Sequence, residues 1–437
     1  MRTRIINCTL VPGVDGESHI PFIQNAEVQV DGRLITYAGE SKNAPDFKPE
    51  QEIDASGCIC MPGLVNLHTH TPMTFLRSAG ADLTLDDWLN QVIFKLEAQW
   101  DLDLVRTATD LGCMEMLRFG TTSFCDMYMY TDSIVKAVRD NGMRAMIGHG
   151  VVDSDGSCKD LEAGIELARH WNRCCNDRVR VAIAPHAEYT TTPQLIEAAA
   201  RAALDFDIPF HIHVSETKAE HEGCIRRRGM TPMRYLEAHG ALDAKVIAAH
   251  CVWLSDEDIE LAARHNVTIV HNPVSNLKLA SGIAPVAKMI AHGCSIALGT
   301  DSVASNDNLN LWEEIKLMPL LQKGTTLDPT VISPAQALAA ATSVGAKALG
   351  FDNLGMLKAG YIADLILVNI HTPHMTPNIH PESNLIYSLQ GSDVRLTMVD
   401  GKVLYRDGEY TTLDAEAVLH AANEGAEEMY RRFRAGS

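Results

Sequence analysis

The sequence lacks the patterns that mark membrane and secreted proteins. No apolar run approaches the roughly 18 to 20 residues that a membrane-spanning helix requires, and Asn7, Thr9 and Pro12 interrupt the N-terminus too early for a signal peptide. Cys-x-x-Cys spacing is absent, and the 11 cysteines are scattered, which favours reduced thiols over a disulfide framework. We therefore predict a cytoplasmic protein with no membrane partner.

Positive charge is also scarce. The 437 residues include 37 Lys and Arg against 56 Asp and Glu, which gives a formal net charge of −19. Such a surface repels nucleic acid and anionic lipid, so neither is an expected partner. The 46% hydrophobic content is typical of a globular chain, and the length predicts a large domain that carries a smaller one.

Both ends of the chain carry the same hairpin signal. An Asp-Gly pair stands between alternating apolar residues in AEVQVDGRLITYAG (26–39) and in RLTMVDGKVLYRDG (395–408). Asp-Gly suits the positive φ angles of a type I′ turn, so each segment predicts a β-hairpin. With RIINCTLV before the first hairpin and ADLILVNI before the second, the two ends can pair into one small β-sandwich.

The middle of the chain predicts a (β/α)₈ barrel. Eight short apolar runs recur between segments of helical pattern such as TPQLIEAAARAAL, and buried parallel strands have this continuous apolar character. In such a barrel the reactive groups lie at the C-terminal ends of the strands. The runs are 62–70, 120–128, 144–151, 180–186, 210–216, 245–251, 267–273 and 295–302.

The predicted fold class is therefore α/β, with a TIM-type (β/α)₈ barrel and a small β-sandwich domain built from both chain ends. Asp414 is the expected N-cap of a surface helix at the C-terminus. The predicted units are a β-sandwich domain from 1–60 plus 360–413, a barrel from 61–359 and a C-terminal helix from 414–437.

Histidines and acidic residues stand at the predicted strand ends. His68 and His70 are two residues apart and project to one face of a strand. Taken by itself, this pair fits a polar strand end as well as a metal site. A closed barrel brings all its strand ends to one mouth, where we expect His68, His70, His186, His213, Glu216, His250 and Asp301 to meet. Three imidazoles and a carboxylate around an open position suit Zn²⁺, and Fe²⁺ would also fit.

The segments PGLVNLHTH, HIHVSE and LGTDS, with the histidine that ends the sixth strand, resemble the motifs of the amidohydrolase superfamily. Within it the chain is similar to the methylthioadenosine/S-adenosylhomocysteine deaminase group from residue 1 to about 430. The resemblance implies a purine nucleoside substrate and an oligomer of identical subunits. It implies one divalent metal per chain, because 184–186 offers no lysine or glutamate to bridge two ions. The metal ligands that it implies are His68, His70, His213 and Asp301.

The resemblance also implies hydrolytic deamination at C6 of an aminopurine. A divalent metal lowers the pKa of a bound water from about 15.7 towards 7. Asp301 would accept the proton of that water, and His250 would hold the hydroxide. Glu216 would protonate ring N1. Glu216 also fits a solvated helix start, but its place three residues after a predicted ligand favours proton transfer.

By the same resemblance, Trp88, Glu97 and His186 line the nucleoside pocket. From the residues alone, Trp88 fits a core position better than a ligand platform. Glu97 lies at the edge of an apolar helical stripe and fits a boundary carboxylate as well as a ribose ligand. His186 can donate to a purine nitrogen or a substrate hydroxyl, or can support other site residues.

One segment departs from the group that the chain resembles. Members that handle the homocysteine tail hold its carboxylate with arginines in and just after the third strand. Here that segment has His149 in place of an arginine, and Lys159 is its only cation. We therefore expect a preference for adenosines whose 5′ tail has no carboxylate.

Two alternatives stay open at this point. One is another amidohydrolase activity, such as triazine dechlorination or deamination of guanine or a pterin. The other is a barrel scaffold without catalysis, which the retention of all the ligands and of Glu216 disfavours.

Overall fold

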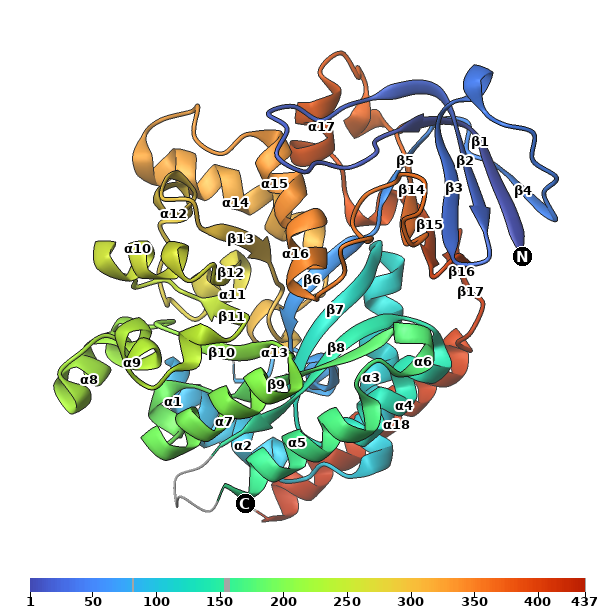
Figure 1. The fold of residues 1–437 in the computed structure, drawn as a ribbon. Helices are drawn as coiled ribbons and strands as arrows, with labels where there is room; N and C mark the ends of the chain where they lie inside the picture. The colour runs from blue at the N-terminus through green and yellow to red at the C-terminus, as the bar shows by residue number, and fades with distance from the viewer. Residues whose placement is uncertain (81, 153–157, 437) are drawn as a thin grey trace.

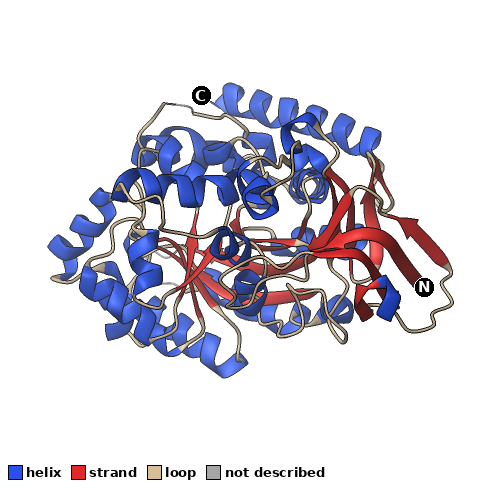
Figure 2. Cartoon of the chain, turned by 90° about the horizontal axis from the view of Figure 1, so that it is seen from above, coloured by secondary structure: helices blue, strands red, loops and turns tan. Residues whose placement is uncertain are grey.

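The structure is a computed structural model that describes residues 1–80, 82–152 and 158–436. Figure 1 shows a central sheet surrounded by helices and, beside it, a second sheet to which both ends of the chain contribute. Seen from above in Figure 2, the second sheet lies at the side of the N-terminus, away from most of the helices.

The central sheet is a parallel barrel. Its strands follow one another in chain order, and every neighbouring pair is parallel. The strands are β6 (Leu64–Thr69), β7 (Thr121–Tyr128), β8 (Arg144–Val151), β9 (Val179–Pro185), β10 (Phe210–Val214), β11 (Val246–His250), β12 (Thr268–His271) and β13 (Ser295–Leu298). Seven of the predicted runs contain one of these strands, and β9 begins one residue before its run at 180–186, so the predicted α/β barrel is confirmed.

Hydrogen bonds join the first barrel strand to the segment that follows the last one. The Asn66 amide donates to Thr300 Oγ1 at 2.7 Å, and the Thr300 N–H donates to Asn66 Oδ1 at 3.0 Å. The N–H of Asp301 donates to the carbonyl of His68 at 3.0 Å. These bonds bring Asp301 beside the two histidines of β6.

Helices cover the outside of the barrel (Figures 1 and 2). Side chains that the sequence supplies cap several of them: Thr192 Oγ1 accepts from Leu195 N–H, and Ser255 Oγ from Asp258 N–H. The longer helices are α3 (Leu102–Arg118), α4 (Thr131–Asn141), α5 (Lys159–Trp171), α7 (Pro193–Phe206), α8 (Lys218–Arg228), α9 (Pro232–Ala238), α10 (Asp256–Arg264), α14 (Leu311–Thr326), α15 (Pro334–Ala340) and α17 (Pro381–Tyr387).

Short helical segments occupy the connections and the mouth of the barrel. The apolar helical stripe beside Glu97 predicts one helix over 86–100. The structure instead has a π-helical stretch, η3, between two short α-helical pieces over 85–97. The short elements are η1 (Ser41–Asn43), η2 (Thr71–Leu76), α1 (Leu85–Asp87), η3 (Trp88–Ile93), α2 (Phe94–Glu97), α6 (Cys174–Asp177), η4 (Glu188–Thr190), η5 (Ala241–Asp243), α11 (Pro273–Lys278), α12 (Val286–Ala291), α13 (Val303–Asn306), α16 (Ser343–Ala348), η6 (Pro373–Met375) and η7 (Gly391–Asp393).

The second sheet joins the two ends of the chain. Its hydrogen-bonded order is β17-β16-β15-β14-β5-β1-β2-β3, with β4 beside β1. Both predicted hairpins are present, as the antiparallel pairs β2–β3 and β15–β16. The strands are β1 (Arg2–Leu10), β2 (Ile23–Asp31), β3 (Leu34–Glu40), β4 (Gln51–Asp54), β5 (Cys58–Pro62), β14 (Leu365–Asn369), β15 (Val394–Val399), β16 (Lys402–Arg406) and β17 (Glu409–Tyr410).

The C-terminal segment forms the helix α18 (Ala415–Gly436), which packs along α3. Asp414 Oδ1 accepts from the N–H of Ala417 at 3.0 Å, as expected for an N-cap. The division into units at 60, 359 and 413 stays a prediction, and β5 runs across the first of these positions. No helix in the described ranges is long and apolar enough to span a membrane.

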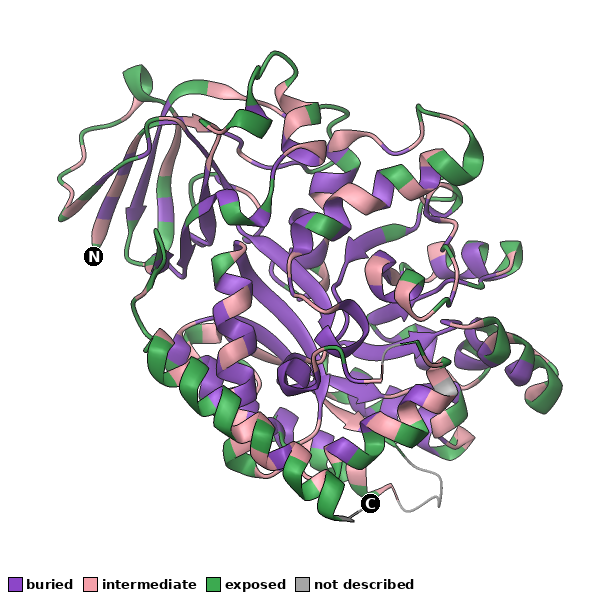
Figure 3. Cartoon of the chain, turned by 180° about the vertical axis from the view of Figure 1, so that it is seen from behind, coloured by how far each residue is buried: buried purple, intermediate pink, exposed green. Residues whose placement is uncertain are grey.

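The barrel is a filled core with its site at one end. Figure 3 shows buried strands at the centre and helices whose outer faces are exposed. Small and apolar side chains of the barrel strands form one buried cluster inside the barrel. They are Val65, Leu67, Cys125, Met146, Ala182, Ile247, Val270 and Ala297.

A buried ion pair links the barrel to the second sheet. Arg144, at the start of β8, is fully buried. Its guanidinium donates to both oxygens of Asp364, at 2.8 and 3.1 Å, and to Asp400 at 3.1 Å. Removing Arg144 would leave Asp364 buried without a counter-charge, whereas Asp400 keeps Arg33 at 3.1 Å. An uncompensated buried charge is strongly destabilising.

We expect Arg144→Met to lower the free energy of unfolding by about 3–5 kcal/mol, because Asp364 would stay buried without its cation. Urea unfolding followed by circular dichroism measures this change. Arg139→Met is the matched control: Arg139 is exposed and pairs with Asp140 at 2.7 Å, so its loss should cost less than about 1 kcal/mol. Equal effects of the two substitutions would contradict a special role of the buried pair.

Candidate functional site

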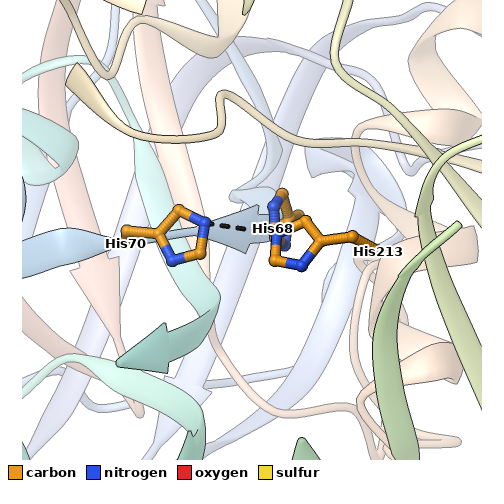
Figure 4. A group of neighbouring side chains, drawn as sticks. All are labelled: His68, His70 and His213. Carbon is orange, nitrogen blue, oxygen red and sulfur yellow. Dashed lines mark hydrogen bonds between the residues drawn. The ribbon is translucent and has the colours of Figure 1, made fainter. Parts of the chain in front are cut away.

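The residues predicted from strand ends meet at the mouth of the barrel. Figure 4 shows the rings of His68, His70 and His213 turned toward one another, although they come from β6, its C-terminal end and β10. Two overlapping groups have ligand atoms within 4.8 Å of one another: His68, His70 and His213, and His68, His250 and Asp301.

The spacing of these atoms fits a small divalent ion. Metal–ligand bonds of roughly 2.0–2.1 Å place the ligand atoms of a tetrahedral ion about 3.3–3.4 Å apart. Asp301 Oδ1 lies 3.4 Å from His68 Nε2 and 3.3 Å from His70 Nε2. The Nε2 atoms of His70 and His213 are 3.4 Å apart. His68 Nε2 is buried and has no hydrogen-bond partner, as expected for an atom placed to bind a metal.

Hydrogen bonds on the far side of each ring fix its orientation. His70 Nδ1 is 2.6 Å from the carbonyl of Met127, and His213 Nδ1 is 2.7 Å from the carbonyl of His186. A carbonyl can only accept, so each Nδ1 carries a proton and each Nε2 faces the site. His68 Nδ1 lies 3.0 Å from Nε2 of the buried His211.

Asp301 is held by its backbone N–H, which donates to the carbonyl of His68, and by one carboxylate oxygen. Its Oδ2 accepts from Ser275 Oγ at 2.6 Å and from Ser305 Oγ at 2.9 Å, which leaves Oδ1 toward the histidines. Asp301 adopts a φ of +59°, which is unusual for a residue other than glycine. Gly299 lets this segment approach β6, because a Cβ there would stand 2.9 Å from the Cβ of His68.

The electrostatics of the ligand cluster follow from burial and from Asp301. Burial lowers the pKa of His68 to about 4 and that of His213 well below its ordinary value. Burial also lowers the pKa of His70, but the hydrogen bond and charge of Asp301 raise it to about 9 overall. His70 must therefore lose a proton when a metal binds.

Glu216 and His250 stand beside the ligand cluster. Glu216 Oε2 lies 3.8 Å from His250 Nε2, and Ser281 Oγ donates to Glu216 Oε1 at 3.3 Å. Asn276 Oδ1 accepts from His250 Nδ1 at 2.8 Å. Burial raises the pKa of Glu216, so this carboxyl holds a proton more readily than an exposed glutamate.

The backbone of Glu216 is itself anchored. The Glu220 carboxylate accepts the N–H groups of Ser215 and Glu216 at 2.8 and 2.7 Å. Burial, followed by the charge of Glu216, raises the pKa of Glu220 to about 7. This carboxylate fixes the turn that carries Glu216 into the site.

A cavity opens above the predicted metal ligands. Its wall includes the three predicted substrate residues, Trp88, Glu97 and His186. Trp88 is buried and its indole N–H donates to the carbonyl of Ala79 at 2.9 Å, so a ligand can contact only its ring. Burial lowers the pKa of His186 to about 4, which keeps its ring neutral.

The end of β8 and the residue after it border this cavity, and they bring no cation to it among the described residues. Gly150 and Val152 belong to the wall. His149 faces a neighbouring, more open hollow, and burial lowers its pKa. Lys159 is exposed at the start of α5 and lines neither space. Residues 153–157, which belong to the same predicted segment, lie outside the described residues.

Several residues of the site were not predicted from the sequence. His211 could have been found, because it shares a strand face with His213 two residues away. Asn276, Ser275 and Glu220 carry no such signal, since each acts through a loop or helix whose position only the tertiary structure defines. Tyr128, the last residue of β7, also lines the cavity.

Comparisons with known proteins agree with this geometry. The profile of the amidohydrolase family matches residues 59–404. The chain is 42% identical over 381 residues to a 5′-deoxyadenosine deaminase of Methanothermobacter thermautotrophicus, covering 86% of this chain and 89% of the relative. It is 40% identical over 412 residues to a 5-methylthioadenosine/S-adenosylhomocysteine deaminase of Dictyoglomus turgidum, covering 94% and 96%. A zinc-bound crystal structure of an adenosine deaminase from Xanthomonas campestris superposes with a TM-score of 0.93, at 31% identity and 98% coverage of both chains.

We expect His68→Ala to lose metal and activity together, because it removes a ligand, whereas Glu216→Gln should keep its metal and lose turnover by about 10²–10⁴-fold. Elemental analysis of the purified variants, with a deamination assay, measures both quantities. The control is Glu222→Gln, an exposed position on the same helix as Glu220, which should change neither. Turnover of Glu216→Gln within a few-fold of wild type would exclude Glu216 as the proton donor.

Proposed function

Because the chain belongs to the amidohydrolase family, we propose that it is a metal-dependent deaminase of adenosine-type nucleosides. It would replace the 6-amino group of the purine by oxygen and release ammonia. One observation carries this proposal: the predicted metal ligands and Glu216 lie together at one cavity. Relatives named as deaminases of 5′-deoxyadenosine and of 5-methylthioadenosine, similar over most of the chain, support the substrate class.

We propose one divalent cation per chain, Zn²⁺ in the first place and Fe²⁺ as the alternative. His68, His70, His213 and Asp301 would hold it, with His250 at the open side of the cluster. Ala184, Pro185 and His186 offer no group that bridges two ions. When bound, such a cation lowers the pKa of water towards neutrality.

The chain's own residues would move the protons. Asp301 would accept one from the attacking water. Its Oδ2 is held by two serines, so Oδ1 is the oxygen that faces the site. The Nε2 of His250 would orient that water and stabilise the oxygen that develops negative charge. Glu216, which faces the cavity, would protonate ring N1 as C6 becomes tetrahedral. Asp301 would then pass the proton that it took from the water to the amino group, which leaves as ammonia, and the proton of the new hydroxyl would return to Glu216 as C6 becomes a carbonyl.

The same cavity would position the nucleoside. The ring of Trp88 would pack against the base or sugar, and the neutral His186 would hydrogen-bond to a purine nitrogen or a hydroxyl. The Glu97 carboxylate would accept the ribose hydroxyls. The apolar wall between these groups excludes water from the reacting carbon.

We further propose that the favoured nucleosides carry no carboxylate on the 5′ side. The wall of the cavity has no lysine or arginine among the described residues, and Lys136 is the only one around the neighbouring hollow. A carboxylate enclosed without a cation loses its hydration and gains no compensating charge. To bind a carboxylated tail, the site would need a positive charge from Lys159 or from a neighbouring subunit. We also propose an oligomer of identical subunits, and light scattering measures whether it forms.

We expect 5′-methylthioadenosine, 5′-deoxyadenosine or adenosine to exceed S-adenosylhomocysteine in kcat/KM by roughly ten- to hundred-fold, the usual effect of a missing charged hydrogen bond. Ammonia release over a panel of these nucleosides measures the ratio. Triazines, guanine and a pterin serve as controls for the other activities of the family. A tenfold preference for S-adenosylhomocysteine would contradict the expected tail preference, whereas activity on a triazine alone would contradict the nucleoside proposal.

A further inference from the structure

A short hydrogen-bond chain stands behind Glu97 and leads out of the cavity. The Tyr128 hydroxyl donates to Glu97 Oε1 at 2.7 Å, and the Trp100 indole N–H donates to the Tyr128 oxygen at 2.8 Å. Tyr128 ends β7, Glu97 ends α2, and Trp100 follows three residues later. Tyr128 and Glu97 line the cavity, whereas Trp100 does not and is buried behind them.

The direction of this chain is fixed by the donors that it contains. An indole nitrogen can only donate, and a tyrosine hydroxyl has one proton. Since Trp100 already donates to the tyrosine oxygen, the single proton of Tyr128 points to Glu97. That bond requires Glu97 Oε1 to accept, and an ionised carboxylate accepts best.

The other oxygen of Glu97 has no partner among the described residues. Tyr128 is the only group in the described ranges that donates to this carboxylate, and the carboxylate lies on the wall of a largely apolar cavity. Oε2 of this carboxylate would gain hydrogen bonds from a ligand that brings donors to it. Groups that donate, such as hydroxyls, satisfy Oε2, whereas groups that only accept do not.

We propose that Tyr128, directed by Trp100, is a positioning residue that holds Glu97 with one oxygen free to accept the 2′ and 3′ hydroxyls of the nucleoside. This rests on the proposed function, since it assigns Glu97 to the sugar of the substrate. It makes the enzyme selective for ribonucleosides over sugars that lack these hydroxyls.

The position of Tyr128 also ties the sugar to the reacting centre. The preceding residue, Met127, accepts the Nδ1 proton of the predicted ligand His70 at 2.6 Å. Consecutive residues of β7 therefore orient a metal ligand and the sugar-binding carboxylate. The end of β7 would therefore set the distance between a bound ribose and a metal held by His70.

The test compares Tyr128→Phe with wild type on adenosine and on 2′,3′-dideoxyadenosine. We expect the substitution to raise KM for adenosine by roughly 10- to 100-fold, the effect of losing a hydrogen bond to a charged group, with kcat changed by less than about threefold. With dideoxyadenosine KM should change by less than about twofold, because that sugar offers Glu97 no hydroxyl. Adenosines lacking only the 2′ or the 3′ hydroxyl should fall between.

Tyr235→Phe is the matched control, because Tyr235 is buried and its hydroxyl has no hydrogen-bond partner. Its kinetics should equal those of wild type on both substrates. If Tyr128→Phe does not fold, Trp100→Phe replaces it. In that variant the Tyr128 hydroxyl stays, but no indole N–H directs its proton to Glu97. We then expect a smaller rise in KM that again depends on the sugar hydroxyls.

Equal losses on adenosine and dideoxyadenosine would overturn the proposal and leave Tyr128 a merely structural residue. A wild-type enzyme that deaminates adenosine and dideoxyadenosine equally well would overturn the assignment of Glu97 to the sugar. A wild-type enzyme that releases no ammonia from any adenosine would instead overturn the proposed function itself, and the sugar role with it.

Discussion

The closure of the barrel between β6 and the end of β13 is the constraint on which the site depends. The side chains of Asn66 and Thr300 and the bond from Asp301 N–H to the His68 carbonyl make this junction. They place a carboxylate from residue 301 within 3.4 Å of an imidazole from residue 68. Gly299 is needed at this point, because any side chain there would collide with His68.

Around this junction the protein buries several polar and charged groups close together. The orphaned Nε2 of His68, the carboxylate of Asp301 and the shielded Glu216 all lose hydration, and burial penalises each charged form. Hydrogen bonds from Ser275, Ser305 and Asn276 offset part of this cost and orient the groups. A cation at the centre would supply the remaining charge. The charge of the cation would then both stabilise the buried groups and activate the water.

Much of the fold could be predicted from the sequence, because apolar runs and Asp-Gly turns are local signals. The eight barrel strands and the two hairpins lie where these signals place them. The ligand candidates could be named too, since a barrel gathers all its strand ends at one mouth. The resemblance to a known family then separated Glu216 and His250 from ordinary strand-end residues.

The rest could not be predicted because it depends on backbone geometry and on contacts distant in sequence. A π-helical stretch at Trp88–Ile93 turns a periodic helix pattern into an irregular wall, and the periodicity of the sequence gives no sign of it. His250 and Asp301 adopt φ angles of +71° and +59°, which no propensity favours for these residues. The Trp100–Tyr128–Glu97 chain joins a loop, a strand end and a helix, so only the packed structure assembles it.

We propose that one cation, held where β6, β10 and the end of β13 meet, makes the barrel a nucleoside deaminase. The most direct test is to strip the enzyme of metal, add Zn²⁺ in measured steps and follow ammonia release from adenosine at each step. We expect no activity without metal and a linear rise that stops at one equivalent per chain. Full activity of the stripped enzyme, or a rise that continues to two equivalents, would contradict it.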